Sequence, residues 1–202
     1  MDVGRSKSEW WAMSVVYDRN GKFEIKQGGP LVGENLDEQS IRYCIKEAYN
    51  YVQSKSLVYL RDGEVFETER KVIKQCIKDL PYEEVAIVSI KETTPYRIFR
   101  RLGQRITKPL SGDYYFLDEY NVVLCAAGVD EYEHGMPKPI VAEVIPVRGD
   151  IDVKSVVEDV FRLTYLNWSS PIHSYSKPAP LKLAHELASE LSSGIRRFGP
   201  PF

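Results

Sequence analysis

The chain has 202 residues, of which 43% are hydrophobic and 28% are charged, and its formal net charge is −2. This balance is typical of a folded globular protein and excludes a disordered chain, and no apolar run is long enough to span a bilayer. We expect one domain, because this length allows one core of ordinary size. The N-terminus is polar and lacks a signal-type hydrophobic segment, so we expect the protein to stay in the cytoplasm.

The cysteines and histidines are too scattered for a cluster that binds metal. The three cysteines are odd in number and lack metal-ligand spacing, which argues against both a disulfide framework and a zinc site. We therefore predict that they are small buried thiols. The residues concerned are Cys44, Cys76, Cys125, His134, His173 and His185.

The first third of the chain predicts a β-hairpin and a helix. Residues 10–17 are rich in β-branched and aromatic side chains, which is typical of a strand. Residues 18–21 predict a turn, and residues 22–27 predict a return strand that ends at the Gly-Gly-Pro of residues 28–30. The next apolar residues have helical spacing, with one face formed by Leu36, Ile41, Cys44, Ile45, Ala48, Tyr49 and Val52.

A short apolar run at residues 57–60 ends at an acid followed by glycine, Asp62 and Gly63. The run predicts a buried strand, and Asp62 then stands at the mouth of the sheet, where ligands of open α/β sheets bind. The alternative is that Asp62 only shapes the turn before Gly63. A second helix is predicted directly afterwards, with one face formed by Val65, Phe66, Val72, Ile73, Cys76, Ile77 and Leu80.

The rest of the chain continues this alternation of strands and helices. Residues 84–90 are almost continuously apolar, which predicts a strand buried on both faces in a mixed or parallel sheet. Pro139 suits an edge strand or the start of a strand. Further predicted elements are a hairpin within residues 113–127, a strand at 139–147, a helix that opens at 150–152 and is ended by 167–171, and a last helix from 178–180. This order predicts an α/β fold with a ribonuclease H-like mixed sheet flanked by helices.

Positive charge is concentrated in residues 91–110, which contain six bases and one acid, Glu92. Such a segment suits phosphate groups, so we expect it to hold a nucleic-acid backbone without reading its sequence. The alternative is a solvated surface loop. Residues 111–134 carry six acids and no lysine or arginine. The candidate nucleic-acid ligands are Lys91 and Arg97 first, followed by Arg100, Arg101, Arg105 and Lys108.

Three acids and one imidazole lie where we expect strand ends and loops of this fold to converge: Asp2, Glu34, Asp62 and His185. Hard oxygen ligands with one nitrogen can hold two divalent ions about 4 Å apart, the spacing used for in-line displacement at phosphorus. Taken separately, each residue also has an ordinary explanation. On these explanations Asp2 is a terminal residue and Glu34 is a charge at a helix N-terminus. Asp62 is a turn former, and His185 is a residue on a helix face.

Two stretches near the end of the chain resemble the closing motif of the PIWI domain of Argonaute proteins. They are Leu-Thr-Tyr-Leu-Asn-Trp at residues 163–168 and Pro-Ala-Pro-Leu-Lys-Leu-Ala-His at residues 178–185. The Leu-Arg-Asp-Gly of residues 60–63, the Gly33-Glu34 pair before a helix and the Asp-Val-Gly of residues 2–4 are similar to other signatures of that domain, in the same order. The resemblance covers essentially the whole chain, residues 1–202.

This resemblance implies a metal-dependent endonuclease that cuts a target strand paired to a short guide, with DNA or RNA as guide and target. It implies a catalytic tetrad of Asp2, Glu34, Asp62 and His185, with Asp2, Asp62 and His185 as ligands of two Mg²⁺ or Mn²⁺ ions. Asp2 and Asp62 would hold the ion that activates water, His185 would share the second ion, and Glu34 would complete the set when its loop closes.

The chain departs from the family in two ways. Only Met1 precedes Asp2, so we expect a first core strand that is truncated or that starts upstream. The PAZ and MID domains do not fit into 202 residues, so we expect a fragment of a longer product, a split subunit with a companion chain that supplies the PAZ, MID and N regions, or the product of a decayed gene. One alternative is therefore a catalytically silent module that binds a guide duplex or a partner. The other is an unrelated ribonuclease H-like nuclease, which the Pro-Ala-Pro motif disfavours.

Overall fold

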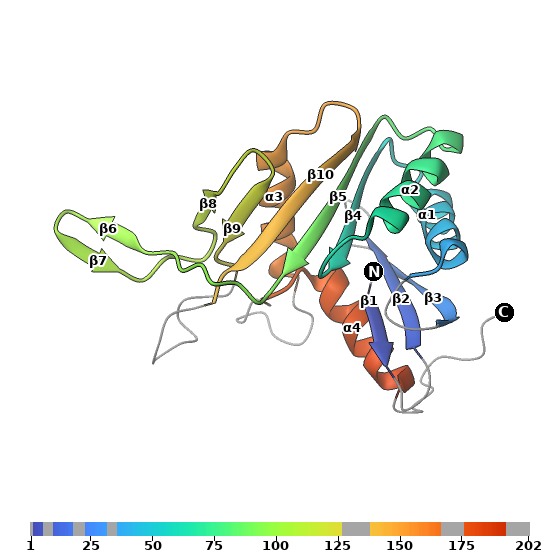
Figure 1. Ribbon diagram of the computed structural model, residues 1–202, viewed down its shortest axis with the longest axis horizontal. Coiled ribbons are helices and arrows are strands. Elements are labelled where there is room, and N and C mark those ends of the chain that lie inside the picture. Colours follow the sequence, from blue (N-terminus) through green and yellow to red (C-terminus); the bar gives the residue numbers. More distant parts are fainter. Residues whose placement is uncertain are drawn as a thin grey trace.

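The computed structural model places a five-stranded sheet between two layers of helices (Figure 1). The α/β fold class with a mixed sheet flanked by helices is thus confirmed, in agreement with a ribonuclease H-like fold. The structure describes residues 2–5, 10–17, 23–31, 36–126, 138–166 and 176–192. The predicted turn at residues 18–21 and the predicted helix break at 167–171 lie outside these ranges, as do His134 and His173.

The central sheet has the strand order β4-β5-β10-β9-β8, in which β4 and β5 are parallel and the other neighbours antiparallel. The prediction of a buried strand at residues 84–90 is confirmed, because residues 85–90 are all buried. Pro139 directly precedes β10, which lies between β5 and β9, so it marks the start of an interior strand and the edge-strand alternative is wrong. The strands are β4 (Ser56–Asp62), β5 (Glu84–Lys91), β8 (Tyr114–Phe116), β9 (Asn121–Leu124) and β10 (Ile140–Arg148).

One face of this sheet is covered by α1 (Glu38–Val52) and α2 (Glu67–Cys76), with a 3₁₀ turn at Ile77–Asp79. Their apolar faces pack with every second residue of β4 and β5, as the helical spacing predicts. Phe66 departs from the prediction, because it caps α2 instead of lying within it and is 43% exposed. The buried side chains of this layer include Ile41, Ile45, Tyr59, Ile73, Val85 and Ile87.

The opposite face is covered by α3 (Val153–Thr164) and the start of α4 (Ala179–Ser192). The helix predicted to open at residues 150–152 is confirmed, since its first residue is Val153 and the Asp152 side chain caps it by accepting a hydrogen bond from the Lys154 N–H. The buried side chains of this layer include Leu60, Val88, Ile90, Val157, Val160 and Leu181. Successive residues of β4 therefore point into different layers, which places Asp62 on the same face as Leu60.

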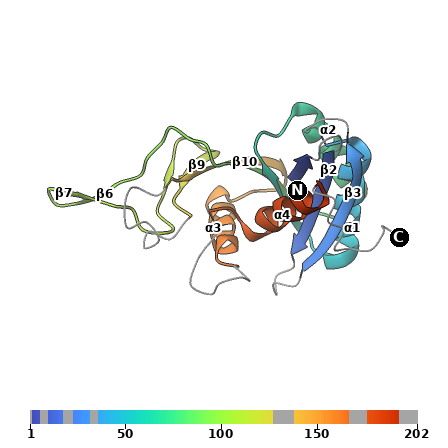
Figure 2. The ribbon, with the colours of Figure 1, turned by 90° about the horizontal axis from the view of Figure 1, so that it is seen from below.

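The N-terminal strands β1 (Asp2–Arg5), β2 (Trp10–Tyr17) and β3 (Phe23–Leu31) form a separate antiparallel sheet. The predicted hairpin is confirmed, but β3 runs through the Gly-Gly-Pro that was expected to end it. These residues are accommodated by a register shift between Trp11 and Met13 of β2, where β3 has one extra residue. Helix α4 packs against β1 and β2 and also contacts β4, so it joins the two sheets (Figures 1 and 2).

The basic segment folds into a hairpin that the sequence patterns did not indicate. Strands β6 (Arg100–Leu102) and β7 (Arg105–Thr107) pair only with each other and project away from the body of the molecule (Figures 1 and 2). Gly103 supplies the positive φ of +61° that the two-residue turn needs. The strands have three residues each, too few for a clear alternation of apolar and polar side chains.

The cysteines behave as predicted, since all three are buried thiols that form no disulfide in the described structure. Within the described residues, no helix is long and apolar enough to cross a membrane.

Candidate functional site at the ends of two parallel strands

Asp62 is the last residue of β4 and lies opposite Ile90 of the parallel strand β5. Gly63 follows with φ +79°, a conformation that favours glycine, and turns the chain away from the sheet. The Gly63 N–H donates to the Ile90 carbonyl at 2.8 Å, and the Ser89 hydroxyl donates to the Gly63 carbonyl at 2.7 Å. These two hydrogen bonds of Gly63 thus fix the turn after Asp62 to β5.

An ammonium group joins Asp62 to a second carboxylate. Lys177 Nζ lies 2.8 Å from Asp62 Oδ2 and 3.0 Å from Glu92 Oε2. Glu92 follows the last residue of β5 and also accepts a hydrogen bond from the Ser176 hydroxyl at 3.2 Å. The residues just before α4 are therefore tied to the carboxyl ends of both parallel strands.

Lys177 keeps its positive charge in this setting. Its side chain is only 11% exposed, and burial lowers the pKa of its ammonium group. The hydrogen bonds to Asp62 and Glu92 outweigh burial, so the net shift of the Lys177 pKa is upward. Two carboxylates at the edge of the sheet thus share one buried cation.

A buried ion pair supports the strand end from the other face of the sheet. Arg61 Nε lies 3.6 Å from Glu69 Oε2 of α2, and the two side chains are 7% and 1% exposed. Arg61 Nη1 donates to the Asp62 carbonyl at 2.7 Å. Burial raises the pKa of the Glu69 carboxyl, and the Arg61 guanidinium opposes that shift. Arg61 therefore links the backbone of Asp62 to the first helical turns of α2.

The structure brings the elements that carry three of the predicted site residues into contact. Asp2 is the first residue of β1, His185 is exposed on α4, and α4 contacts both β1 and β4. The side chain of Asp2 lies outside what the structure describes, and so does Glu34 with the whole of residues 32–35. Convergence of the four side chains stays a prediction.

The described side chains include no group of three or more histidine, cysteine or acidic residues that is placed to hold a metal ion. Asp62 and Glu92 are hard oxygen donors that converge on one cation, which is the chemistry Mg²⁺ and Mn²⁺ require. These two donors fit part of a divalent-metal site. The rest of such a site would have to come from residues outside the described side chains.

The predicted nucleic-acid ligands lie at and beyond the end of β5. Lys91 is half-buried and pairs with Glu143 of β10 at 3.4 Å, whereas the four arginines are exposed. Arg100 Nε lies 3.4 Å from Asp113 Oδ2, so the basic and acidic segments touch at this pair. The arginines are Arg97, Arg100, Arg101 and Arg105.

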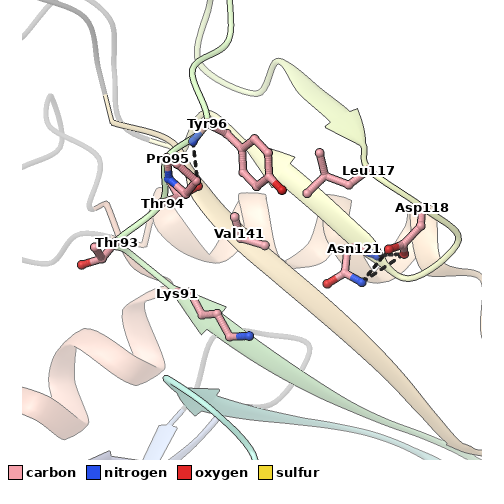
Figure 3. Close-up of a pocket in the computed structure, with 9 residues that line it drawn as sticks. All are labelled: Lys91, Thr93, Thr94, Pro95, Tyr96, Leu117, Asp118, Asn121 and Val141. Carbon is pink, nitrogen blue, oxygen red and sulfur yellow. Dashed lines mark hydrogen bonds between the residues drawn. The ribbon is translucent and has the colours of Figure 1, made fainter.

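A cavity of about 540 Å³ opens beside the start of this basic segment (Figure 3). Lys91 and Val141 lie on its sheet side, and Tyr96 and Leu117 face each other across it. The Asp118 carboxylate accepts hydrogen bonds from the backbone N–H and the side-chain amide of Asn121 at 2.8–3.0 Å. The cavity is thus bounded by the basic segment and by the β8–β9 turn.

Sequence reasoning missed Glu92 and Lys177 as site residues. The signal for Glu92 was present, because an acid directly after a strand parallel to β4 must lie at the same edge as Asp62. Lys177 carried no such signal, since it is 115 residues from Asp62 in sequence and only the position of α4 brings them together.

Comparison with known proteins points to one family. No family model matches the chain. The Argonaute protein of Methanocaldococcus jannaschii is 31% identical over 107 residues, which cover 52% of this chain and 15% of that protein. The chain therefore spans a small part of that relative.

Solved structures of Argonautes have the same fold. Clostridium butyricum Argonaute, bound to a guide DNA and a 19-mer target DNA, matches 94% of this chain with a TM-score of 0.78 and 21% identity. Aquifex aeolicus Argonaute matches 100% with a TM-score of 0.71 and 21% identity. Marinitoga piezophila Argonaute, in complex with 5′-OH guide RNA and target DNA, matches 93% with a TM-score of 0.70 and 17% identity. The chain covers 26–28% of these three proteins.

Proposed function

We propose that this chain, an Argonaute homologue by sequence and by fold, is a PIWI-type unit that binds a guide strand and its target and cuts the target at a phosphodiester bond. The observation that carries the proposal is Asp62, fixed by the Gly63 turn at the carboxyl ends of two parallel strands. Homology over 107 residues and the shared fold support the nucleic-acid part, because the related structures contain guide and target strands.

The cutting step assigns roles to residues of this chain. Asp62 would hold divalent metal together with Asp2 and His185, and Glu34 would complete the ligand set. Mg²⁺ or Mn²⁺, when bound, supplies activation of the attacking water and stabilisation of the leaving oxygen. Arg61 keeps the Asp62 backbone in place through its hydrogen bond to the Asp62 carbonyl.

Lys177 has a distinct role in this proposal. Its ammonium pairs with both Asp62 and Glu92, so it occupies a cation position at the carboxylate that metal would need. Binding of divalent metal to Asp62 would then compete with Lys177. The second candidate function is a module that binds a guide–target duplex without cleaving it. The pairing of Asp62 with Lys177 favours this candidate.

Replacing Lys177 by methionine tests the competition. Without metal, Lys177→Met should lower the free energy of unfolding by about 1.5–3 kcal/mol, because the hydrogen bond to the less exposed Asp62 carboxylate is lost, while the contact with the exposed Glu92 contributes little. With Mn²⁺, the variant should gain more thermal stability than the wild type, since its carboxylates are free to bind metal. Differential scanning fluorimetry over a Mn²⁺ titration measures both effects.

The matched control for this test is Lys182→Met, because Lys182 pairs with Glu186 on the exposed side of α4. It should leave the response to Mn²⁺ unchanged. An equal Mn²⁺ response in the wild type and Lys177→Met would reject the competition. No response in either protein, with Mn²⁺ up to millimolar concentration, would favour the module without cleavage.

The basic segment provides a test of nucleic-acid binding itself. Each phosphate contact releases counterions, so replacing Arg97, Arg100 and Arg101 together by glutamine should reduce the slope of log affinity against log salt by about 2 for a single strand. Fluorescence anisotropy at several salt concentrations measures this slope. An unchanged slope in the triple variant would place the phosphate contacts elsewhere on the molecule.

A further inference from the structure

Residues 96–120, which we call the arm, carry most of the exposed large apolar side chains of the described chain. Ten of the fifteen lie in this segment, although it makes up a small part of the protein. The arm consists of the β6–β7 hairpin and of β8, the edge strand of the central sheet (Figures 1 and 2). The ten are Tyr96, Phe99, Leu102, Ile106, Leu110, Tyr114, Tyr115, Phe116, Leu117 and Tyr120.

The aromatic rings of the arm are presented to solvent. Phe99 is 56% exposed directly before β6, and Tyr115 is 67% exposed in the middle of β8. Tyr114 and Phe116 point to the other side of β8 and pack edge to face with ring centroids 5.7 Å apart. Exposed apolar side chains gathered in one segment of a folded protein often mark a binding surface.

The arm also carries a net positive charge, concentrated in its first part. Residues 96–110 contain four arginines and one lysine and no acid, and residues 111–120 contain three acids, Asp113, Asp118 and Glu119. Arg97 and Arg101 donate to backbone carbonyls, and among the described side chains no carboxylate pairs with either of them, whereas Arg100 pairs with Asp113. Phe99 directly precedes two of these arginines in the sequence. A partner must therefore offer both negative charge and flat apolar faces.

We propose that the arm binds an unpaired nucleic-acid strand by stacking bases on Phe99 and Tyr115 while arginines contact the phosphates. A single strand offers phosphates and exposed base faces together, whereas a duplex hides the base faces in its own stack. The inference rests on the proposed nucleic-acid function and extends it. Besides the cleavage site at Asp62, it assigns a second site, on the arm, that requires unpaired bases. An acidic apolar protein segment is the competing partner.

The test compares two fluorescent strands of about 16 nucleotides, a length at the upper end of common single-strand sites. One is oligodeoxythymidine, and the other has the same phosphates but only abasic sugars. The wild-type chain should bind the thymidine strand at least about tenfold more tightly, since stacking is lost without bases. Phe99→Ala with Tyr115→Ala should remove this preference without changing the salt slope.

Two further variants make the result specific. Phe99→Trp with Tyr115→Trp should keep the preference, because tryptophan also stacks on bases. Tyr43→Ala with Tyr51→Ala on α1 removes two exposed rings outside the arm and should have no effect. Circular dichroism checks that the folds of all variants agree.

Each remaining outcome has a definite meaning. Equal wild-type affinity for the two strands would overturn the stacking site and leave phosphate binding intact. Binding of neither strand would reject the stacking site together with the proposed nucleic-acid function. Displacement of the thymidine strand by poly-glutamate as readily as by unlabelled oligodeoxythymidine would assign the arm to acidic protein partners and overturn the proposal.

Discussion

Asp62→Asn is expected to abolish target cleavage while guide and target still bind. Asparagine keeps the shape of the side chain but offers a neutral oxygen, which cannot offset the charge of divalent metal. Loss of such a ligand should cost roughly 3–5 kcal/mol of transition-state stabilisation, a fall in rate of more than about a hundredfold. The measurement is cleavage of a labelled target by a guide-loaded complex that contains this chain together with the remaining regions of an Argonaute.

The control for this prediction is Asp159→Asn, which removes an exposed carboxylate of α3 that pairs locally with Arg162. It should leave both cleavage and binding unchanged. Glu34→Ala and His185→Ala should each impair cleavage without preventing duplex binding. Full cleavage by Asp62→Asn, or equal cleavage in EDTA, would rule out the metal mechanism and leave the binding module as the function.

The elements around Asp62 were predictable because their signals are local. The apolar run of β4, the Asp62-Gly63 turn and the helical spacing of α2 each follow from a few neighbouring residues. The buried strand β5 was predictable for the same reason, since its residues face helices on both sides. The local order of strand, acid, turn and helix therefore placed Asp62 correctly at the sheet edge.

Other features depend on contacts between distant parts of the chain. Whether β10 lies inside the sheet or at its edge depends on its pairing with β9 and β5. The residues near Pro139 do not indicate this pairing. The ion pair of Lys177 with Asp62 depends on where α4 docks. Arg61 and Glu69 carry no local signal of burial, yet they are buried because α2 packs over the end of β4. Long-range packing decided each of these cases.

The buried pair supports the largest expected effect on stability. Arg61→Met should lower the free energy of unfolding by about 3–5 kcal/mol at neutral pH, because it leaves the Glu69 carboxylate buried without a counter-charge. The hydrogen bond from Arg61 to the Asp62 carbonyl is lost as well. Urea denaturation followed by circular dichroism measures the change.

The loss should depend on pH in a defined direction. Arg61 lowers the pKa of Glu69 against the effect of burial, so its removal raises that pKa further. A carboxyl with a raised pKa in the folded state binds its proton more tightly there than in the unfolded chain, so the variant loses stability as pH rises through that pKa. Arg61→Met should therefore be closer to the wild type in acid than at neutral pH.

Two variants separate the buried charge from other effects of the substitution. Arg61→Met combined with Glu69→Leu should recover most of the stability, because an apolar pair of similar volume often replaces a buried ion pair without loss. Lys55→Met breaks an exposed pair with Glu83, whose side chains are 75% and 64% exposed, and should change stability by less than about 1 kcal/mol. A double variant as unstable as Arg61→Met alone would show that Arg61 acts mainly through the Asp62 backbone.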